Sequence, residues 1–263
     1  MPIFHYTNVQ SLALILHSKK IRFTRLDLLD DLKEIDGLPD NIESSFFVSC
    51  WTEESEENLS LWSLYTRMQG VRIELPQKFY KEYKHPKGDY GHWGFSEETI
   101  CPINIEEFRT DEYIISNPFW LEDGFYIKVI YDKNYKELKE SAILKTEKET
   151  GINHIKNLII YKNPIWEFQK ESRFYLMANP LPPLSDFDGD RIKQMKNISL
   201  GRINNSCDHI DIGINPEVLD SIVVRLYPNC EYSDELIVRS ILDKFTKNGK
   251  IEHSNLNGTY RTK

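Results

Sequence analysis

The sequence lacks the glycine-rich phosphate motifs and the paired cysteines that mark several common enzyme and metal classes. Neither GxGxxG nor GxxxxGK[ST] occurs, which disfavours both a dinucleotide-binding βαβ unit and a P-loop. The four cysteines (Cys50, Cys101, Cys207, Cys230) are scattered without a CxxC pair, which argues against a zinc ribbon or a redox motif. Reduced thiols in a cytoplasm are the simplest interpretation.

Long apolar runs and an excess of positive charge are also missing. No apolar run approaches the roughly 18 to 20 residues that span a bilayer, and the first ten residues lack the pattern of a signal peptide. We therefore expect a cytoplasmic protein without a membrane partner. The net charge of −8 disfavours a protein that coats nucleic acid, because that mode uses a basic surface. A basic groove built from Arg67, Arg72 and Arg173 would reopen that possibility.

The composition is that of a folded globular chain. It has 263 residues, of which 40% are hydrophobic and 28% are charged, enough to bury a sizeable core. Strand and helix patterns are mixed without regular βα alternation, so we predict an α+β fold of short, mostly antiparallel strands with flanking helices. We expect one domain over 1–263, with an aromatic-rich excursion at about 76–126.

Local patterns predict several elements and one solvated loop. A short strand at 3–6 precedes a helix that Thr7 should open, because Thr7 and Gln10 have capping-box spacing. The acidic stretch 25–41 reads as a solvated loop, and 133–162 as mostly helical. His85 and His92 precede Cys101, but they lack metal-ligand spacing, and we predict no metal site.

The stretch from Phe46 to Leu75 predicts a strand, an acidic loop, a short helix and a second strand. Trp62 and Tyr65 lie three residues apart on the helix, so both rings share one face. They can either belong to the core or stack on a flat ligand. We expect Trp62 to be the more buried, and Tyr65, with its polar tip, to face the ligand.

Several motifs together resemble a bacterial family known only as domain of unknown function 2971. They are spread over nearly the whole chain: HYT at 5–7, LLDDLKE at 28–34, VSCWTE at 48–53, LWSLY at 61–65, WEFQKESRF at 166–174 and HSNL at 253–256. The chain departs from that family at Asp30-Asp31-Leu32, where the family tends to have Asn-Asp-Pro.

A more distant resemblance is to ADP-ribosyltransferases of the His-Tyr-Glu kind. Their order is a first strand ending in His with a small hydroxyl residue, a helix bearing Tyr, and a Glu that opens a late strand. Here the matching residues are His5 with Thr7, then Tyr65, then Glu171. The resemblance implies an ADP-ribosyltransferase-like fold that binds NAD as substrate. It also implies a toxin or phage-defence effector, with an acceptor that is a protein or a nucleic acid, and a possible neutralising partner.

The chemistry of NAD cleavage needs these residue types. Breaking the bond between ribose and nicotinamide develops an oxocarbenium-like centre, which a nearby carboxylate stabilises. Glu171 is the candidate and Glu167 the reserve. A flat cationic ring favours an aromatic face, from Tyr65 or Trp62, while His5 would bond the adenosine ribose. The predicted NAD-binding set is His5, Tyr6, Thr7, Arg22, Arg25, Trp62, Tyr65 and Arg173, in which Arg22 or Arg25 would clamp the pyrophosphate.

Each candidate also has a structural interpretation. Glu171, two residues before Arg173, can belong to an ion pair, and His5 can be a core histidine with satisfied hydrogen bonds. Arg22 and Arg25 can pair with the acidic loop. The sequence therefore leaves two functions open: an enzyme that transfers ADP-ribose or hydrolyses NAD, and a non-catalytic module that binds a nucleotide or a partner in the same cleft.

Overall fold

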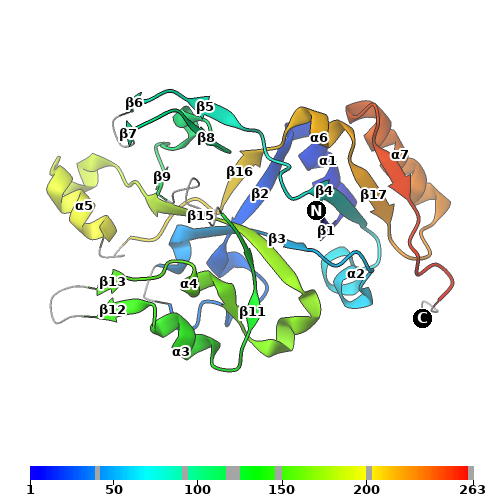
Figure 1. The fold of residues 1–263 in the computed structure, drawn as a ribbon, viewed down its shortest axis with the longest axis horizontal. Helices are drawn as coiled ribbons and strands as arrows, with labels where there is room; N and C mark the ends of the chain where they lie inside the picture. The colour runs from blue at the N-terminus through cyan, green and yellow to red at the C-terminus, as the bar shows by residue number, and fades with distance from the viewer. Residues whose placement is uncertain (39–41, 91–93, 117–124, 146–149, 200–202, 260–263) are drawn as a thin grey trace.

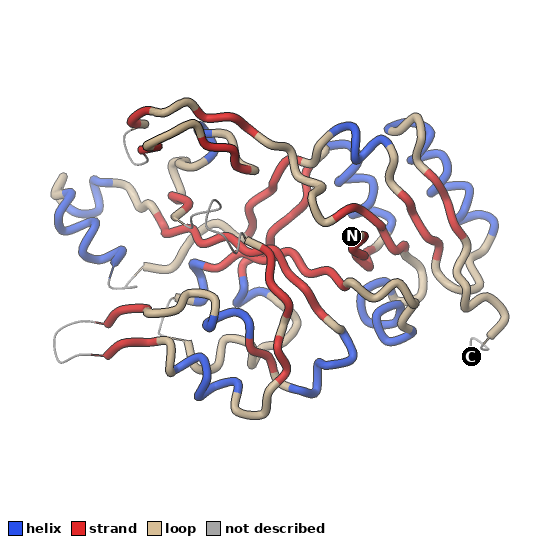
Figure 2. Tube along the Cα trace, viewed as in Figure 1, coloured by secondary structure: helices blue, strands red, loops and turns tan. Residues whose placement is uncertain are grey.

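A mainly antiparallel sheet of ten strands forms the centre of the molecule (Figure 1). The structure is a computed structural model that describes residues 1–263 apart from 39–41, 91–93, 117–124, 146–149, 200–202 and 260–263. Figure 2 shows the strands gathered in the middle and most helices at the periphery. The predicted α+β class with mostly antiparallel strands is confirmed.

The strands of the large sheet come from all parts of the chain. They are β1 (Pro2–Thr7), β2 (Lys20–Arg25), β3 (Phe46–Thr52), β4 (Val71–Pro76), β9 (Tyr113–Ile115), β10 (Tyr126–Lys128), β15 (Glu171–Pro180), β16 (His209–Gly213), β17 (Val223–Leu226) and β18 (Lys250–Glu252). The main path runs β10-β15-β3-β1-β4-β17-β18, while β2, β16 and β9 pair at its sides. Within this sheet, the described pair β17 and β18 is parallel.

Smaller strands and the helices lie around this sheet. Four two-stranded pairs are formed by β5 (Tyr83–His85) with β8 (Thr99–Cys101), β6 (Gly88–Asp89) with β7 (Gly94–Phe95), β11 (Ile130–Tyr131) with β14 (Tyr161–Lys162), and β12 (Ile143–Lys145) with β13 (Thr150–Ile152). The helices are α1 (Val9–Ser18), α2 (Leu59–Thr66), α3 (Tyr135–Glu140), α4 (Asn157–Ile160), α5 (Arg191–Ser199), α6 (Pro216–Asp220) and α7 (Tyr232–Phe245), and the 3₁₀ turns are η1 (Leu26–Leu28), η2 (Glu43–Ser45), η3 (Ile105–Glu107), η4 (Pro164–Gln169) and η5 (Leu184–Phe187). None of the helices in the described ranges is long and apolar enough to cross a membrane.

Two of the predicted elements differ from the structure. Thr7 belongs to β1, where it pairs with Val71, and helix α1 begins at Val9. Asn8 is the N-cap, and its side chain accepts a hydrogen bond from the Ser11 amide at 2.7 Å. The stretch 133–162 is not mostly helical, because β12, β13 and β14 interrupt it. Isoleucine at 143 and 152 favours the extended backbone there.

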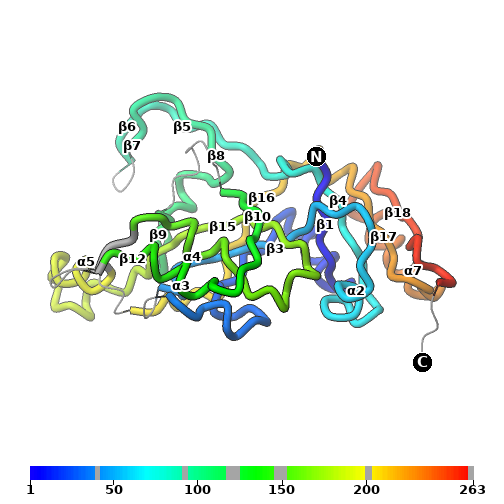
Figure 3. The backbone as a smooth tube through the Cα atoms, turned by 60° about the horizontal axis from the view of Figure 1, so that its bottom comes forward, coloured from blue at the N-terminus to red at the C-terminus, as the bar shows by residue number. Residues whose placement is uncertain are grey.

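The predicted excursion is a set of short hairpins that leave the sheet after β4. Figures 1 and 3 show β5 to β8 projecting to one side of the molecule before β9 returns to the edge of β15. His85 is buried there, and its Nε2 lies 2.9 Å from the Ile103 carbonyl oxygen. Cys101 bonds the same carbonyl, and His92 falls outside the described residues. The parts of the excursion at 91–93 and 117–124 are likewise outside them.

An aromatic core holds the excursion and β10 to the sheet. The ring of Phe174 on β15 is 1% exposed. Its ring centroid lies 4.6 Å from that of Tyr126, 5.2 Å from Phe79 and 5.3 Å from Phe125. Such contacts add to the hydrophobic burial of each ring. Phe174 therefore joins segments that are distant in the sequence.

The loop before α2 is anchored to the C-terminal segment by one buried carboxylate. The Glu57 side chain is 1% exposed and accepts hydrogen bonds from Trp62 Nε1 at 3.0 Å, Ser254 Oγ at 2.6 Å and the Asn255 amide at 2.6 Å. Arg225 lies 3.3 Å from it as an ion-pair partner. Helix α2 is thus fixed by residues almost two hundred positions further along the chain.

We expect Phe174→Ala to cost about 3 to 5 kcal/mol of unfolding free energy, because it removes a buried ring and leaves a cavity. Urea unfolding followed by circular dichroism measures the loss. Tyr232→Ala is the control, since Tyr232 is 77% exposed and should change stability by less than about 0.5 kcal/mol. Equal effects of the two substitutions would contradict this description of the core.

Candidate active site

A cavity of about 200 Å³ lies where strands β1 and β3 separate. In the described sheet these two strands are paired at Phe4 and Thr52, and residues from both sides of the fork line the cavity. Helix α2 contributes Tyr65, and β15 contributes Glu171. The lining residues that carry chemistry are His5, Tyr6, Arg22, Thr24, Asp30, Ser49, Cys50, Thr52, Tyr65, Lys162, Gln169 and Glu171.

His5 enters the cavity as a neutral hydrogen-bond acceptor. Its Nδ1 lies 2.8 Å from the Cys50 carbonyl oxygen, and since a carbonyl can only accept, Nδ1 carries the proton. Burial lowers the pKa of His5 and outweighs the opposing effect of that bond. Among the described residues, no polar group hydrogen bonds Nε2, so this nitrogen can accept a hydrogen bond from a ligand hydroxyl.

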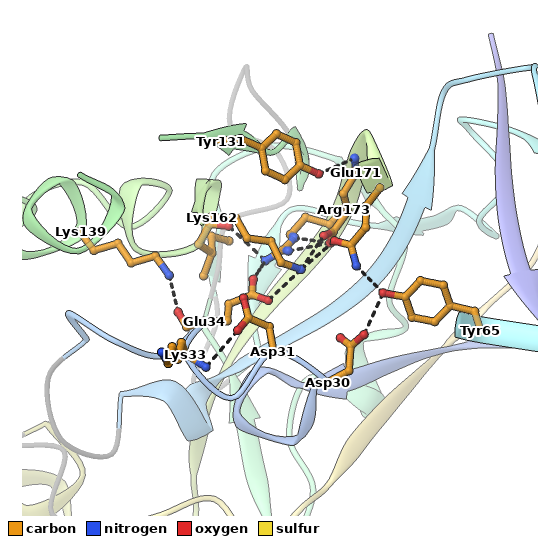
Figure 4. A network of polar contacts seen from close by, with 12 residues as sticks. Asp30, Asp31, Lys33, Glu34, Tyr65, Tyr131, Lys139, Lys162, Glu171 and Arg173 are labelled. Carbon is orange, nitrogen blue, oxygen red and sulfur yellow. Dashed lines mark hydrogen bonds and ion pairs between the residues drawn. The ribbon is translucent and has the colours of Figure 1, made fainter. Parts of the chain in front are cut away.

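Tyr65 is held by two hydrogen bonds at its hydroxyl group. Its Oη donates to Asp30 Oδ2 at 2.9 Å and accepts from Gln169 Nε2 (Figure 4). Burial, followed by the charge of Asp30, raises the pKa of Tyr65 far above its usual range. The phenol therefore stays neutral, and its ring position is fixed from two sides.

Glu171 is a buried, ionised carboxylate at the start of β15. Its Oε1 accepts hydrogen bonds from Arg173 at 2.8 Å (Nε) and ion-pairs with Nη2 at 2.6 Å, while Oε2 accepts from Lys162 Nζ at 3.0 Å. Burial alone would raise the pKa of Glu171, but the charges of Arg173 and Lys162 outweigh it and lower the pKa to about 2. The side chain is 5% exposed, so Glu171 forms the floor of the cavity and does not stand in an open cleft.

A second carboxylate completes the network below the cavity. Glu34 ion-pairs with Arg173 Nη1 and, at 3.2 Å, with Lys162 Nζ. Two carboxylates and two cations thus neutralise one another out of contact with water. Lys139 donates to the Glu34 backbone carbonyl, and burial lowers the pKa of Lys139 to about 8. Figure 4 shows these five residues, which come from the loop after η1, from α3, from β14 and from β15.

This network corrects the expectation that 25–41 is a solvated loop. Glu34 is 1% exposed and Asp31 is 7% exposed, because the loop folds under β15 to meet the two buried cations. Residues 39–41 of that stretch lie outside the described residues. Asp30, in contrast, stays exposed at the rim of the cavity.

The cavity gathers some of the predicted site residues and leaves out others. His5, Tyr6, Arg22, Tyr65 and Glu171 line it, whereas Thr7, Arg25, Trp62, Glu167 and Arg173 do not. The side chain of Arg22 is 55% exposed at the rim, and its Nε donates to Asp211 Oδ1 at 3.2 Å.

Each residue outside the cavity has partners elsewhere. Trp62 is fully buried and bonds Glu57. Arg25 ion-pairs with Asp27 at 2.7 Å and bonds backbone carbonyls near β16, which turns it away from the cavity. Glu167 is 58% exposed and ion-pairs with Lys170 at 3.1 Å.

Two further arginines are buried away from the cavity. Arg173, which was predicted to bind NAD, is fully buried beneath the cavity and held by Glu171 and Glu34, so it has no free surface with which to contact NAD. Arg72 is 2% exposed, and its guanidinium lies 4.4 Å from the Phe4 ring centroid. Arg67, Arg72 and Arg173 therefore form no basic groove.

Sequence reasoning missed Asp30, Cys50, Lys162 and Gln169 as lining residues. Lys162 ends an apolar run, LIIYK, and a lysine in such a setting is a signal for a buried partner. Its Nζ donates both to Glu171 and, at 3.0 Å, to Gln169 Oε1. Gln169 in turn donates to the Tyr65 hydroxyl, so Lys162 and Gln169 link Glu171 to Tyr65. Burial, and then the charge of Glu171, raise the pKa of Cys50 well above its usual value, so its thiol is not a nucleophile.

We expect acid to destabilise the fold through Glu171. Its pKa is lower in the folded chain than the ordinary value of 4.5, so between these values the unfolded chain binds more protons. The stabilisation is therefore complete above about pH 4.5 and is lost as the pH falls towards 2. Between about pH 6 and pH 3 the wild type should lose on the order of 2 kcal/mol that Glu171→Gln does not lose.

Urea unfolding at the two pH values measures this difference. Glu167→Gln makes the same change in charge at an exposed position and should keep the pH dependence of the wild type. A Glu171→Gln variant with an unaltered pH dependence would contradict the assigned ionisation.

Comparison with family models, with curated proteins and with solved structures finds no match for this chain. We therefore infer the function from the geometry of the cavity and from the chemistry of the residues that line it.

Proposed function

We propose that this protein binds NAD and cleaves the bond between ribose and nicotinamide, as an ADP-ribosyltransferase or an NAD glycohydrolase with a fold of the ADP-ribosyltransferase kind. The observation that carries the proposal is that His5, Tyr65 and Glu171, which come from β1, α2 and β15, line one cavity. Their order along the chain is the order of the His-Tyr-Glu enzymes.

Each of the three side chains is in the state that this chemistry needs. The Nε2 of His5 is an acceptor for a ribose hydroxyl, and Tyr65 offers a neutral aromatic ring to the flat, cationic nicotinamide. Glu171 is ionised well below neutral pH and can stabilise positive charge that develops on the ribose. The bond electrons leave with nicotinamide, and an acceptor nucleophile or water attacks the sugar and loses a proton.

The size of the cavity indicates which part of NAD it would enclose. Its volume of about 200 Å³ is below the roughly 300 to 1,000 Å³ of sites that enclose a whole drug-sized ligand. We place nicotinamide and its ribose inside, so that His5 would bond the nicotinamide ribose and not the adenosine ribose expected from the sequence. The pyrophosphate would lie outside near Arg22, whose exposed side chain is at the rim. The acceptor, a protein or a nucleic acid, would approach from the same side in the cytoplasm. A neutralising partner of a toxin or phage-defence effector could cover that opening.

The alternative is a non-catalytic module that binds a nucleotide or a partner in the same cavity. One observation favours it: both carboxylate oxygens of Glu171 are already engaged by Arg173 and Lys162. That neutralisation weakens the charge that Glu171 can present to a sugar. Binding of NAD by calorimetry without turnover would identify the module.

We expect the purified wild type to release nicotinamide from NAD, and Glu171→Gln to lower the rate about 10²- to 10³-fold by removing the charge that faces the sugar. Chromatographic measurement of nicotinamide, with and without candidate acceptors, follows the reaction. Absence of release by the wild type, or equal release by Glu171→Gln, would rule out the catalytic proposal.

Glu34→Gln is the matched control for this measurement. Glu34 pairs with the same two cations but does not line the cavity, so its substitution disturbs the network without removing the group that faces the ligand. We expect Glu34→Gln to stay within about tenfold of the wild-type rate, at a temperature where thermal melts show all three proteins folded.

A further inference from the structure

We propose that Asp30 makes the cavity selective for a ligand that carries a positive charge on a flat ring. This deepens the proposed function, and it rests on that function for the identity of the natural ligand. Asp30 lies in the loop after η1 and is not one of the three residues, His5, Tyr65 and Glu171, that carry the proposed function. Its Oδ2 accepts the hydrogen bond from Tyr65 Oη.

The cavity is lined by two carboxylates, and they differ in whether their charge is compensated. Glu171 has two cations within 3.0 Å, Lys162 and Arg173. Asp30 has no lysine, arginine or histidine at ion-pair distance within the described ranges, and its carboxylate accepts a hydrogen bond from the uncharged Tyr65 hydroxyl. Of the two, Asp30 is therefore the one whose charge acts on a ligand without a compensating cation beside it, whereas Lys162 and Arg173 weaken the charge that Glu171 presents.

The positive groups that line the cavity do not offset Asp30. Lys162 is 3% exposed and is shared between Glu171 and Glu34. Arg22 is held by Asp211 at 3.2 Å, and His5 is neutral because burial lowers its pKa. Counting the groups in the described part of the chain, these pairs leave one uncompensated negative charge at the rim of the cavity, which favours a cation.

Tyr65 brings that charge and an aromatic ring to the same place. A phenol that donates to a carboxylate gains electron density, which strengthens the attraction of its ring for a cation. A flat cation stacked on Tyr65 would also lie beside the Asp30 carboxylate (Figure 4). A neutral ring of the same shape gains the stacking without the charge attraction.

The test compares two small probes that differ in this charge, 1-methylnicotinamide, which is a cation, and nicotinamide, which is neutral. Isothermal titration calorimetry on the full chain should show the wild type binding the cation about tenfold more tightly than the neutral ring. Asp30→Asn keeps an oxygen that can accept from Tyr65 and should bring the ratio of the two affinities close to one. Asp243→Asn, at an exposed position on α7, should keep the wild-type ratio.

The ratio separates charge recognition from a purely structural role, because loosening of the site would weaken both probes together. Equal affinities for the two probes in the wild type, or an unchanged ratio in Asp30→Asn, would overturn the proposal. Neither result depends on turnover. Selective binding of the cation together with no release of nicotinamide from NAD would uphold the role of Asp30 and reject the catalytic function.

Discussion

The buried ion network of Glu34, Lys162, Glu171 and Arg173 is the constraint on which the site depends. Two charges of each sign lie where water cannot solvate them, so each needs the others. Removing one partner from such a group typically costs about 3 to 5 kcal/mol. The loop that carries Glu34 and the strand that carries Lys162 must therefore dock under β15 in one arrangement. Lys162 and Glu171, the two members of this network that line the cavity, form its floor.

The walls of the cavity follow from the way the strands diverge above this floor. Strands β1 and β3 separate beyond Phe4 and Thr52, and the His5 side chain supplies a donor for the Cys50 carbonyl oxygen at the fork. Gln169 connects Lys162 to the Tyr65 hydroxyl, so the network reaches the wall formed by α2. One continuous set of polar contacts thus runs from Glu34, below the sheet, to Asp30 at the rim.

Local patterns in the sequence predicted much of the sheet but little of this network. The strands around His5, Cys50 and Arg173 follow from apolar and β-branched runs. The α+β class also follows, because the elements do not alternate regularly. The order of His5, Tyr65 and Glu171 pointed to one site, and the fold places them around one cavity.

What local patterns could not supply was the pairing of charges distant in sequence. Glu34 lies in an acidic stretch that is indistinguishable by composition from a solvated loop, and its partner Arg173 is 139 positions away. Only part of 133–162 follows the same limit: β14 forms by pairing with the distant β11, whereas β12 and β13 pair with each other nearby in the sequence. Within the same loop, Asp30 is exposed at the rim of the cavity, whereas Glu34 is buried under β15.

The anchoring of Glu57 has a consequence for how the protein is made. Glu57 obtains its partners at 254 and 255 only after that segment has been synthesised, almost two hundred residues later, since synthesis proceeds from the N-terminus. Until then the loop before α2 contains a carboxylate that lacks two of the donors of its eventual buried site. The anchor of the wall that carries Tyr65 therefore forms only after residues 254 and 255 have been made, and a nascent chain that stops before them lacks it. For a protein proposed to consume NAD, that order of assembly would delay activity until this segment is present.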